Sequence, residues 1–304
     1  MMNPEGGTIL VTGATGFIGK RLVKALAEEG WRIRCLVRRR ESILPPGVEV
    51  VVGDLLEPAT LAQACNGVSA AYYLVHSMAG GRAGFERRDR ESARNFVAAA
   101  DRAGISRTIY LGGLGEVRES LSEHLASRLE VAEILKGGSF KTTFLRAAVI
   151  LGAGGASFEM VRFLVDRLPL MITPRWVSTR CQPIAVGDVI RYLTGCLREE
   201  RTAGETFDIG GPEILTYREM MERFAKLSGK NCWIVPVPLL TPKLSSYWVG
   251  LMTPVKPSIS MPLIEGLANE VICKDERIRD ILPIPLTGYD EAVRIALSEE
   301  EKSG

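Results

Sequence analysis

The 304-residue sequence is poor in the residues that build metal sites and disulfide frameworks. It has only two histidines, His76 and His124, and its six cysteines are scattered with no pair at close spacing. We therefore expect no metal site and no structural disulfides. Unpaired cysteines of this kind are typical of a reducing compartment such as the cytoplasm.

An excess of charge of either sign is also lacking, because 38 lysines and arginines stand against 36 aspartates and glutamates, for a net charge of +2. Nucleic-acid binding usually needs a basic face, so we expect a small-molecule or protein partner and no nucleic acid. The uncharged run at residues 244–255 is too short to span a bilayer. The first apolar run begins near residue 8, which leaves no signal peptide, so we expect a cytoplasmic protein.

The most informative motif is TGATGFIG at residues 12–19, between an apolar run at 8–11 and a helical pattern at 22–26. Glycines at this spacing let a strand-to-helix turn close tightly, approach a pyrophosphate and pack the helix on the strand. Gly30 would end that helix, and residues 31–37 would form the next strand. The motif predicts a dinucleotide site, with binding residues Gly13, Thr15, Gly16, Phe17, Ile18 and Gly19.

The residues after the second strand indicate which dinucleotide binds. NAD sites usually carry an acidic residue here that holds the ribose hydroxyls, about 20 residues beyond the glycines, whereas arginine accommodates the 2′-phosphate of NADP. This chain has Arg38, Arg39 and Arg40 before the first carboxylate, Glu41. We therefore predict NADP(H) with Arg38 on the phosphate. For Arg39 and Arg40, a phosphate contact and a solvated basic surface are equally good interpretations.

Strands and helices alternate along the chain in the manner of a doubly wound parallel sheet, an α/β fold. Further strands are predicted at residues 48–52, 70–75, 108–111, 145–151 and 205–209, and a long helix at 86–103. The predicted divisions are a Rossmann NADP-binding core at 1–152, an excursion into a substrate lobe at 153–181, a return to the core at 182–211, and a smaller, mainly helical C-terminal lobe at 212–304. We expect both lobes to form one folding unit.

Ligands of such sheets bind beyond the carboxyl ends of the strands. Asp54 could meet the adenine and Leu55 could cover its face. The remaining cleft residues predicted on this ground are Leu74, Val75, His76, Gly112, Gly113, Ala147 and Ala148. Tyr72 and Tyr73 are expected to be core aromatics, and Ser77 suits either a turn or a position near the nicotinamide.

The ordered motifs TGATGFIG, GDL, YLVHS, YLGGLG, LRAAVILG, QPIAVGDV and FDIGGPEILTYREM extend over nearly the whole chain. Together they resemble the extended and atypical short-chain dehydrogenase/reductases, which include NmrA-like proteins and the NADPH-binding accessory subunit of complex I. The resemblance implies a Rossmann domain and a C-terminal lobe that closes over the nicotinamide end.

The catalytic residues of that family are not found at the matching positions. Gly112 and Gly113 occupy the segment that carries the family's serine or threonine, and His124 and Arg128 stand where the tyrosine and lysine should be. Arg128 has the charge and donors to bind the cofactor, and a solvated position with a surface ion pair to Glu130 or Glu133 is the alternative interpretation of it. His124 could act as a general acid, but a solvated position on an amphipathic helix is the better interpretation of it.

Residues 233–267 are apolar and nearly uncharged, with Lys243, Lys256 and Glu265 as their only charged residues. This composition predicts the wall of an apolar pocket, and it also allows a homodimer contact or a peripheral membrane contact. The leading functional hypothesis is an NADPH-dependent oxidoreductase acting on a small apolar carbonyl, enone or quinone. A non-catalytic NADP(H) sensor or complex-assembly protein is the alternative, and a nucleotide-sugar epimerase or dehydratase ranks third.

Overall fold

The computed structural model describes residues 7–40, 44–75, 82–114, 123–168, 170–173, 175–236 and 269–302. At its centre is a seven-stranded sheet in the order β11-β6-β5-β4-β1-β2-β3, and every pair of neighbouring strands is parallel. The strands are β1 (Thr8–Thr12), β2 (Arg32–Val37), β3 (Glu49–Val52), β4 (Val68–Tyr73), β5 (Arg107–Gly113), β6 (Lys141–Ala147) and β11 (Thr206–Ile209). This topology confirms the predicted doubly wound α/β fold.

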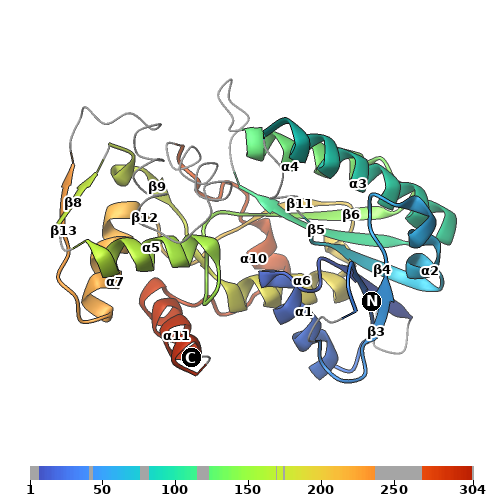
Figure 1. Ribbon diagram of the computed structural model, residues 1–304, viewed down its shortest axis with the longest axis horizontal. Coiled ribbons are helices and arrows are strands. Elements are labelled where there is room, and N and C mark those ends of the chain that lie inside the picture. The colour runs from blue at the N-terminus through green and yellow to red at the C-terminus, as the bar shows by residue number, and fades with distance from the viewer. Residues whose placement is uncertain are drawn as a thin grey trace.

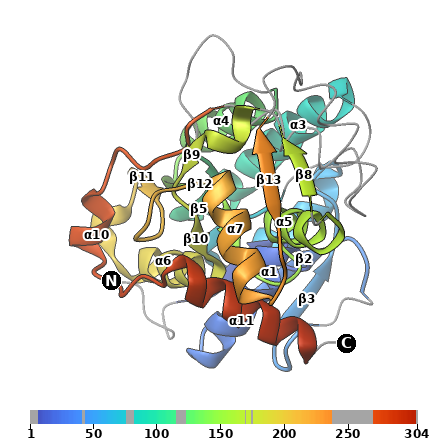
Figure 2. The ribbon, with the colours of Figure 1, turned by 90° about the vertical axis from the view of Figure 1, so that its left-hand side faces the viewer.

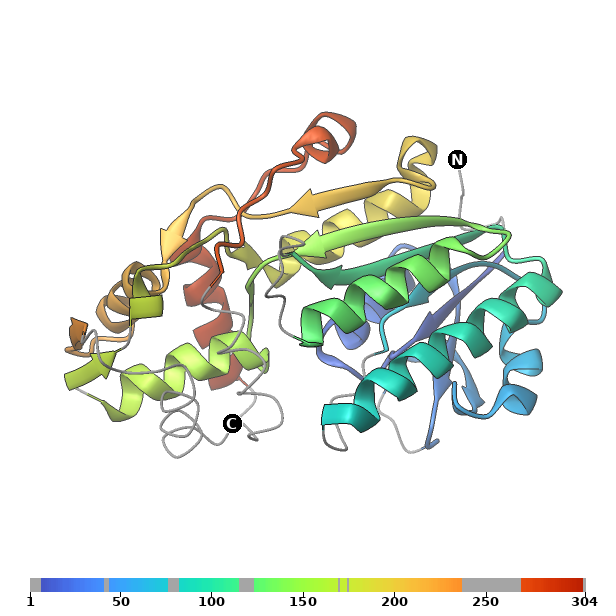
Figure 3. The ribbon, with the colours of Figure 1, turned by 90° about the horizontal axis from the view of Figure 1, so that it is seen from above.

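Helices cover both faces of the sheet, as its apolar strands require. Figures 1 and 3 show the long pair α3 (Arg82–Ala103) and α4 (Glu123–Lys136) on one face, and α1 (Phe17–Glu28) with α6 (Val186–Arg198) on the other. The short helix α2 (Leu61–Cys65) follows the 3₁₀ turn η1 (Pro58–Thr60) and packs beside α3. Leu22, Val23 and Leu26 are fully buried on α1, as their spacing predicted, and Gly30 follows that helix with a φ of +81°.

The predicted sixth strand, at residues 145–151, is two strands in the structure. β6 pairs with β5 and β11 as far as Ala147, and then β7 (Ile150–Leu151) pairs with β10 (Ile184–Ala185) in a separate small sheet. The single-strand prediction was wrong because the sequence between the two strands, Ala148-Val149, is as apolar as the strands and carries no turn residue. The long helix predicted from residue 86 begins at Arg82.

A smaller lobe with its own apolar core stands beyond the carboxyl ends of the sheet (Figures 1 and 2). Its helices are α5 (Ala156–Arg167), α7 (Tyr217–Leu227) and α11 (Tyr289–Glu301), with the 3₁₀ turn η2 (Arg175–Ser178). Two further strand pairs complete it, β9 (Arg180–Cys181) with β12 (Leu215–Thr216), and β8 (Leu170–Thr173) with β13 (Trp233–Pro236). A capping box between Thr216 and Glu219 fixes the start of α7.

The chain returns to the sheet once more before it ends. The buried carboxylate of Asp208, at the end of β11, accepts hydrogen bonds from the backbone N–H groups of Lys274 (2.9 Å) and Asp275 (3.2 Å) and pairs with Arg146. The helix α10 (Arg277–Ile281) then buries Ile278 in the core under α1 and α6. Residues 274–286 thus lie against the Rossmann half, within the stretch that the sequence assigned to the C-terminal lobe.

Candidate functional site

The candidate cofactor site lies where the strand order reverses. From β1 the chain builds β2 and β3 on one side of the sheet and then places β4 on the other side of β1. In doubly wound folds the crevice at this switch point receives a dinucleotide. Residues 13–16 join β1 to α1, so the glycine motif lies in the strand-to-helix turn that the sequence predicted.

The three glycines of the loop have three different environments. Gly13 has a φ of +71°, and a Cβ there would lie 2.5 Å from the carbonyl oxygen of Leu74. A Cβ on Gly19 would overlap the carbonyl oxygen of Gly13 and lie 2.8 Å from the Cα of Ala14. Gly16 is exposed, and a Cβ there would meet only the Gly13 oxygen, at 3.2 Å. Gly13 and Gly19 are thus needed by the protein itself, whereas Gly16 leaves space outside the loop.

The first turn of α1 is open to an anion. Gly16 is its N-cap and supplies no side chain, and the turn contains no acidic residue. Backbone N–H groups at such an uncapped helix start, with the positive end of the helix dipole, favour a phosphate or pyrophosphate. The exposed Thr15 lies beside them. This arrangement fits the pyrophosphate of a dinucleotide.

Arg38 follows β2 directly, and its side chain is exposed. Among the residues that the structure describes, it makes no hydrogen bond or ion pair. By contrast, Arg34 on the same strand is occupied with Glu49 and with the carbonyl oxygens of Ala64 and Asn66. Arg38 is therefore available to an anionic ligand, and Arg39 is also exposed but has an interaction partner.

The two residues predicted at the adenine have structural contacts as well. The carboxylate of Asp54 accepts the N–H of Leu56 at 2.9 Å, and Thr60 binds the backbone of Asp54, which closes the turn after β3. Leu55 is almost fully buried and belongs to the core on the α3 side of the sheet. A cofactor contact by either residue stays a prediction.

The ends of β4 and β5 form the other wall of the crevice. The N–H of Leu74 donates to Thr12 Oγ1 at 3.3 Å, and both Leu74 and Val75 are half-buried. His76 and Ser77 lie outside the described residues. At the end of β5, a Cβ on Gly112 would lie 2.5 Å from Cε2 of Phe144, whose ring stacks on Tyr110. Gly112 lies in the segment where the family carries a serine or threonine, and the stacked ring of Phe144 occupies the space that a side chain at Gly112 would need.

The helix α4 carries the two residues at the family's tyrosine and lysine positions. The side chain of His124 lies outside the described part, so its role stays a prediction. The Nε of Arg128 is buried and has no hydrogen-bond partner within the described ranges. Burial lowers the pKa of the Arg128 guanidinium, and the nearby Tyr110 and Asp89 work in the opposite direction. A buried, unpartnered guanidinium nitrogen is costly without a ligand, which fits a bound anion or ribose oxygen here.

The two adjacent tyrosines of β4 are core residues. Tyr72 is fully buried and donates to the carbonyl oxygen of Leu193 at 3.0 Å, and Tyr73 packs edge-on against Phe96. Burial raises the pKa of both phenols well above the ordinary value, which makes them weaker acids, and both side chains are enclosed in the core. This confirms the prediction that they are core aromatics.

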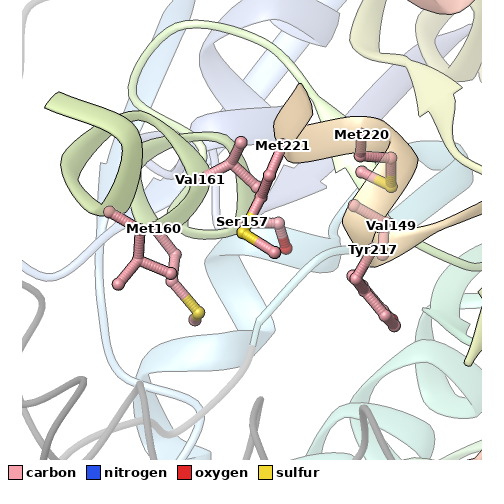
Figure 4. A pocket seen from close by; sticks show the side chains of 8 residues that line it. Val149, Ser157, Met160, Val161, Tyr217, Met220 and Met221 are labelled. Carbon is pink, nitrogen blue, oxygen red and sulfur yellow. The ribbon is translucent and has the colours of Figure 1, made fainter. Parts of the chain in front are cut away.

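Close to the end of β6 lies an apolar hollow that the sequence did not predict as a set of residues (Figure 4). Ala147, the last residue of β6, is buried, and its carbonyl oxygen accepts the N–H of Leu114 at 2.7 Å. Two residues later, Val149 enters the hollow, which has a free volume of about 30 Å³. Side chains of α5 and α7 supply the rest of its lining, namely Ser157, Met160, Val161, Leu164, Tyr217, Met220 and Met221.

The hollow is too small for a ligand as it stands, but methionine makes its walls adaptable, since the side chain is flexible and polarisable. A sequence signal existed in Met220 and Met221, because apolar residues recur at helical spacing along α7 and these two lie on its buried face. The facing residues of α5 could not have been paired with them from sequence.

Phe17 joins the glycine loop to the substrate lobe. A Cβ on Gly155 would lie 2.8 Å from the Phe17 ring, and one on Gly152 would lie 3.3 Å from it. Arg21 stacks on the same ring, donates to the carbonyl oxygen of Ala153 at 2.9 Å, and pairs with Glu299 of α11 at 2.8 Å. The cofactor helix and the lobe therefore share direct contacts.

Two further observations concern metal binding and membrane-spanning helices. Within the described ranges, no group of three or more histidine, cysteine, aspartate or glutamate side chains is arranged to hold a metal ion. None of the helices in those ranges is long and apolar enough to cross a membrane.

Comparisons with known proteins agree with this geometry. A ceramide reductase of Caulobacter vibrioides is 34% identical over 243 residues, which cover 78% of this chain and 76% of that protein. The mitochondrial NADH dehydrogenase (ubiquinone) 1 alpha subcomplex subunit 9 of Arabidopsis thaliana is 24% identical, over 94% of this chain and 76% of the relative.

Among solved structures, a short-chain dehydrogenase/reductase superfamily protein of Agrobacterium tumefaciens with bound NAD superposes with a TM-score of 0.72. The two chains are 19% identical, with 97% of this chain and 98% of the other covered, so this likeness shows the fold. Residues 5–247 match the NmrA-like family, from before the glycine loop to beyond β13. The resemblance read from the motifs is therefore confirmed, and the chain belongs to the NmrA-like family.

Proposed function

We propose that the protein is an NADP(H)-dependent oxidoreductase that reduces a carbonyl, enone or quinone group on a small apolar substrate. The observation that carries this proposal is the position of the apolar hollow. Its wall begins at Val149, two residues beyond the end of β6, and the cofactor crevice lies at the carboxyl ends of the same sheet. An apolar substrate held there would have its reactive group directed toward the crevice.

The residues of the chain divide the work of binding. The uncapped start of α1 and the space beside Gly16 would hold the pyrophosphate, and Arg38 would hold the 2′-phosphate through charge-assisted hydrogen bonds. Arg128 would bind at the nicotinamide ribose, where its family counterpart acts. NADPH supplies a hydride, which adds to the substrate carbon or its conjugate position.

A proton must also reach the substrate so that the reduction balances. The family's tyrosine is absent, and Tyr72 and Tyr73 are buried core residues. We infer that water or the substrate itself supplies the proton, while the apolar walls of Met160, Met220 and Met221 exclude bulk solvent from the rest of the substrate. In this proposal the protein binds and orients the cofactor and the substrate, and the proton does not come from one of its side chains.

A second function, a non-catalytic NADP(H) sensor or assembly protein, is favoured by one observation. The contact between Gly112 and Phe144 leaves no room for the hydroxyl side chain that the family's catalysis uses. The Arabidopsis relative is named as a subunit of a larger enzyme, which suits this alternative.

One experiment separates the two functions. The purified protein is incubated with NADPH and with aldehydes, enones and quinones in short-chain and long-chain forms, and NADPH oxidation is followed by absorbance. We expect turnover that is faster with the longer apolar substrates, and we expect Met220→Gln to remove this advantage. Ile214→Ser, at an exposed apolar position elsewhere in the lobe, is the matched control. Tight NADPH binding with no turnover on the whole panel would favour the second function.

A further inference from the structure

The outer face of the β8–β13 pair is an exposed apolar surface at the end of the lobe farthest from the sheet (Figures 1 and 2). In the parallel register Trp233 lies opposite Leu170, and Ile234 lies opposite Met171. Met171 and Ile234 are buried in the lobe core, whereas Leu170, Trp233 and Val235 are 57%, 72% and 47% exposed. Met171 and Ile234 therefore hold the pair in place, whereas Leu170, Trp233 and Val235 are exposed among the residues that the structure describes.

Three exposed apolar side chains lie close together on this face. Single exposed apolar residues are common on proteins, but here a tryptophan and two aliphatic neighbours share one small face. Tryptophan is enriched where one side of a protein meets the boundary between water and hydrocarbon, because its ring is apolar and its N–H is polar. The composition of this face thus suits a lipid interface.

Positive charge gathers at one end of the same strand pair. Because β8 and β13 are parallel, they start at the same end, and the segments that lead into them bring Arg167, Lys226 and Lys230 there. Two acidic residues lie near the same end, and each has a basic partner: Asp166 forms an ion pair with Lys230, and Glu222 of α7, whose charge acts on Cys232 beside β13, pairs with Arg218. The net excess of positive charge favours a surface that carries anionic headgroups.

The sequence that continues from β13 has a matching composition. Residues 237–268 contain two lysines and a single acidic residue, Glu265, with Tyr247 and Trp248 among apolar residues. Aromatic residues and lysines with few acids are the usual composition of interfacial segments. A second copy of this chain would bring the same positive charge to the contact, which argues against self-association.

We propose that the outer face of the β8–β13 pair docks on the surface of a bilayer that contains anionic lipids, with Leu170, Trp233 and Val235 as its apolar contacts. Arg167, Lys226 and Lys230 bind the headgroups at its rim. This goes beyond the proposed reductase activity and does not depend on it. An apolar substrate dissolved in the bilayer would nevertheless be reached more easily from such a position.

Flotation of the full chain with lipid vesicles tests the proposal. One set of vesicles contains phosphatidylglycerol and phosphatidylcholine, and the other contains phosphatidylcholine alone. We expect binding to the anionic vesicles that weakens with added salt, and a loss of about tenfold or more in Trp233→Glu. Val52→Glu, at a residue that is 50% exposed on β3 in the other half of the molecule, should bind as the unchanged protein does.

The results for the variants distinguish a bilayer from a second copy of the chain. The double variant Lys226→Ala/Lys230→Ala should lose binding to the anionic vesicles, and circular dichroism with NADPH binding should show that every variant remains folded. Binding by Trp233→Glu that equals that of the unchanged protein would overturn the proposal. So would an unchanged protein that binds no vesicles but forms a dimer that Trp233→Glu converts to a monomer, since the face would then join two copies of the chain.

Discussion

Gly19 faces the carbonyl oxygen of Gly13 so closely that no Cβ atom fits between them. This contact closes the loop that begins at β1 and sets the first turn of α1 against it. The third glycine of the motif, Gly16, has no such constraint, because its only near neighbour is the same Gly13 oxygen at 3.2 Å. One motif therefore contains glycines required for the fold and a glycine required for the ligand.

Substitutions at Gly16 and Gly19 should affect different properties, cofactor binding in one case and stability in the other. Gly16→Val is expected to abolish NADPH binding with little change in melting temperature, because its side chain would occupy the space of the pyrophosphate. Gly19→Ala is expected to lower stability by about 1 to 3 kcal/mol, because a Cβ there forces the loop apart. Calorimetric titration and thermal unfolding measure the two effects. Normal binding by a folded Gly16→Val protein would show that the loop is assigned wrongly.

Arg128 should contribute to cofactor affinity. Its Nε is buried without a partner among the described residues, so a cofactor oxygen that accepts a hydrogen bond from the guanidinium would remove that cost. We expect Arg128→Ala to weaken NADPH binding by about tenfold to a hundredfold, and Arg128→Lys, which keeps the charge, to weaken it less. Tyr110 donates to the backbone oxygen of Arg128, a contact that both variants retain. Unchanged affinity in Arg128→Ala would return the residue to a structural role.

His124 should not be an obligatory proton donor. On any substrate that is turned over, we expect His124→Ala to keep both NADPH affinity and turnover within a few-fold of the unchanged protein. Steady-state rates and calorimetry on the same preparation provide the comparison. A large fall in turnover at unchanged cofactor affinity would identify His124 as the general acid.

Two carboxylates where α11 meets α5 should make stability depend on pH. Burial, a hydrogen bond to Glu159 and the charge of Glu159 together raise the pKa of Glu300 to about 7. A glutamate whose pKa is raised by folding contributes stability that is complete below its unfolded value near 4.5 and is lost as pH rises through 7.

Glu300→Gln imitates the protonated form at every pH. We expect it to be more stable than the unchanged protein at pH 8, by on the order of 1 kcal/mol, and no more stable at pH 4. The neighbouring Glu299→Gln is the control, because it breaks the ion pair with Arg21 and should destabilise the protein at pH 8. Thermal unfolding at both pH values measures the difference. An identical pH profile for Glu300→Gln and the unchanged protein would contradict the raised pKa of Glu300.

Most strands of the sheet and the glycine loop could be predicted from the sequence, because both have local signals. Apolar strands, the spacing of Gly13, Gly16 and Gly19, and the helical repeat after them are all readable within a few residues. The boundary between β6 and β7 was not readable, since Ala148 and Val149 look like strand residues and only the change of pairing partner separates the two strands.

The parts of the site that depend on contacts between distant residues could not be predicted from the sequence either. The pair of Arg21 and Glu299 joins residues almost at opposite ends of the chain, and no local pattern marks it. The sequence revealed that Gly112 replaces a hydroxyl-bearing residue, but the reason, the ring of Phe144, lies on another strand. Core packing between distant residues decides such positions.

The preference between NADPH and NADH tests the central claim most directly. We would titrate both cofactors calorimetrically into the unchanged protein, into Arg38→Ala, and into Arg32→Ala, which alters an exposed arginine at the other end of β2. The account predicts tighter binding of NADPH, a preference that Arg32→Ala keeps and that Arg38→Ala reduces by about tenfold to a hundredfold. Equal affinity of the unchanged protein for both cofactors would contradict it.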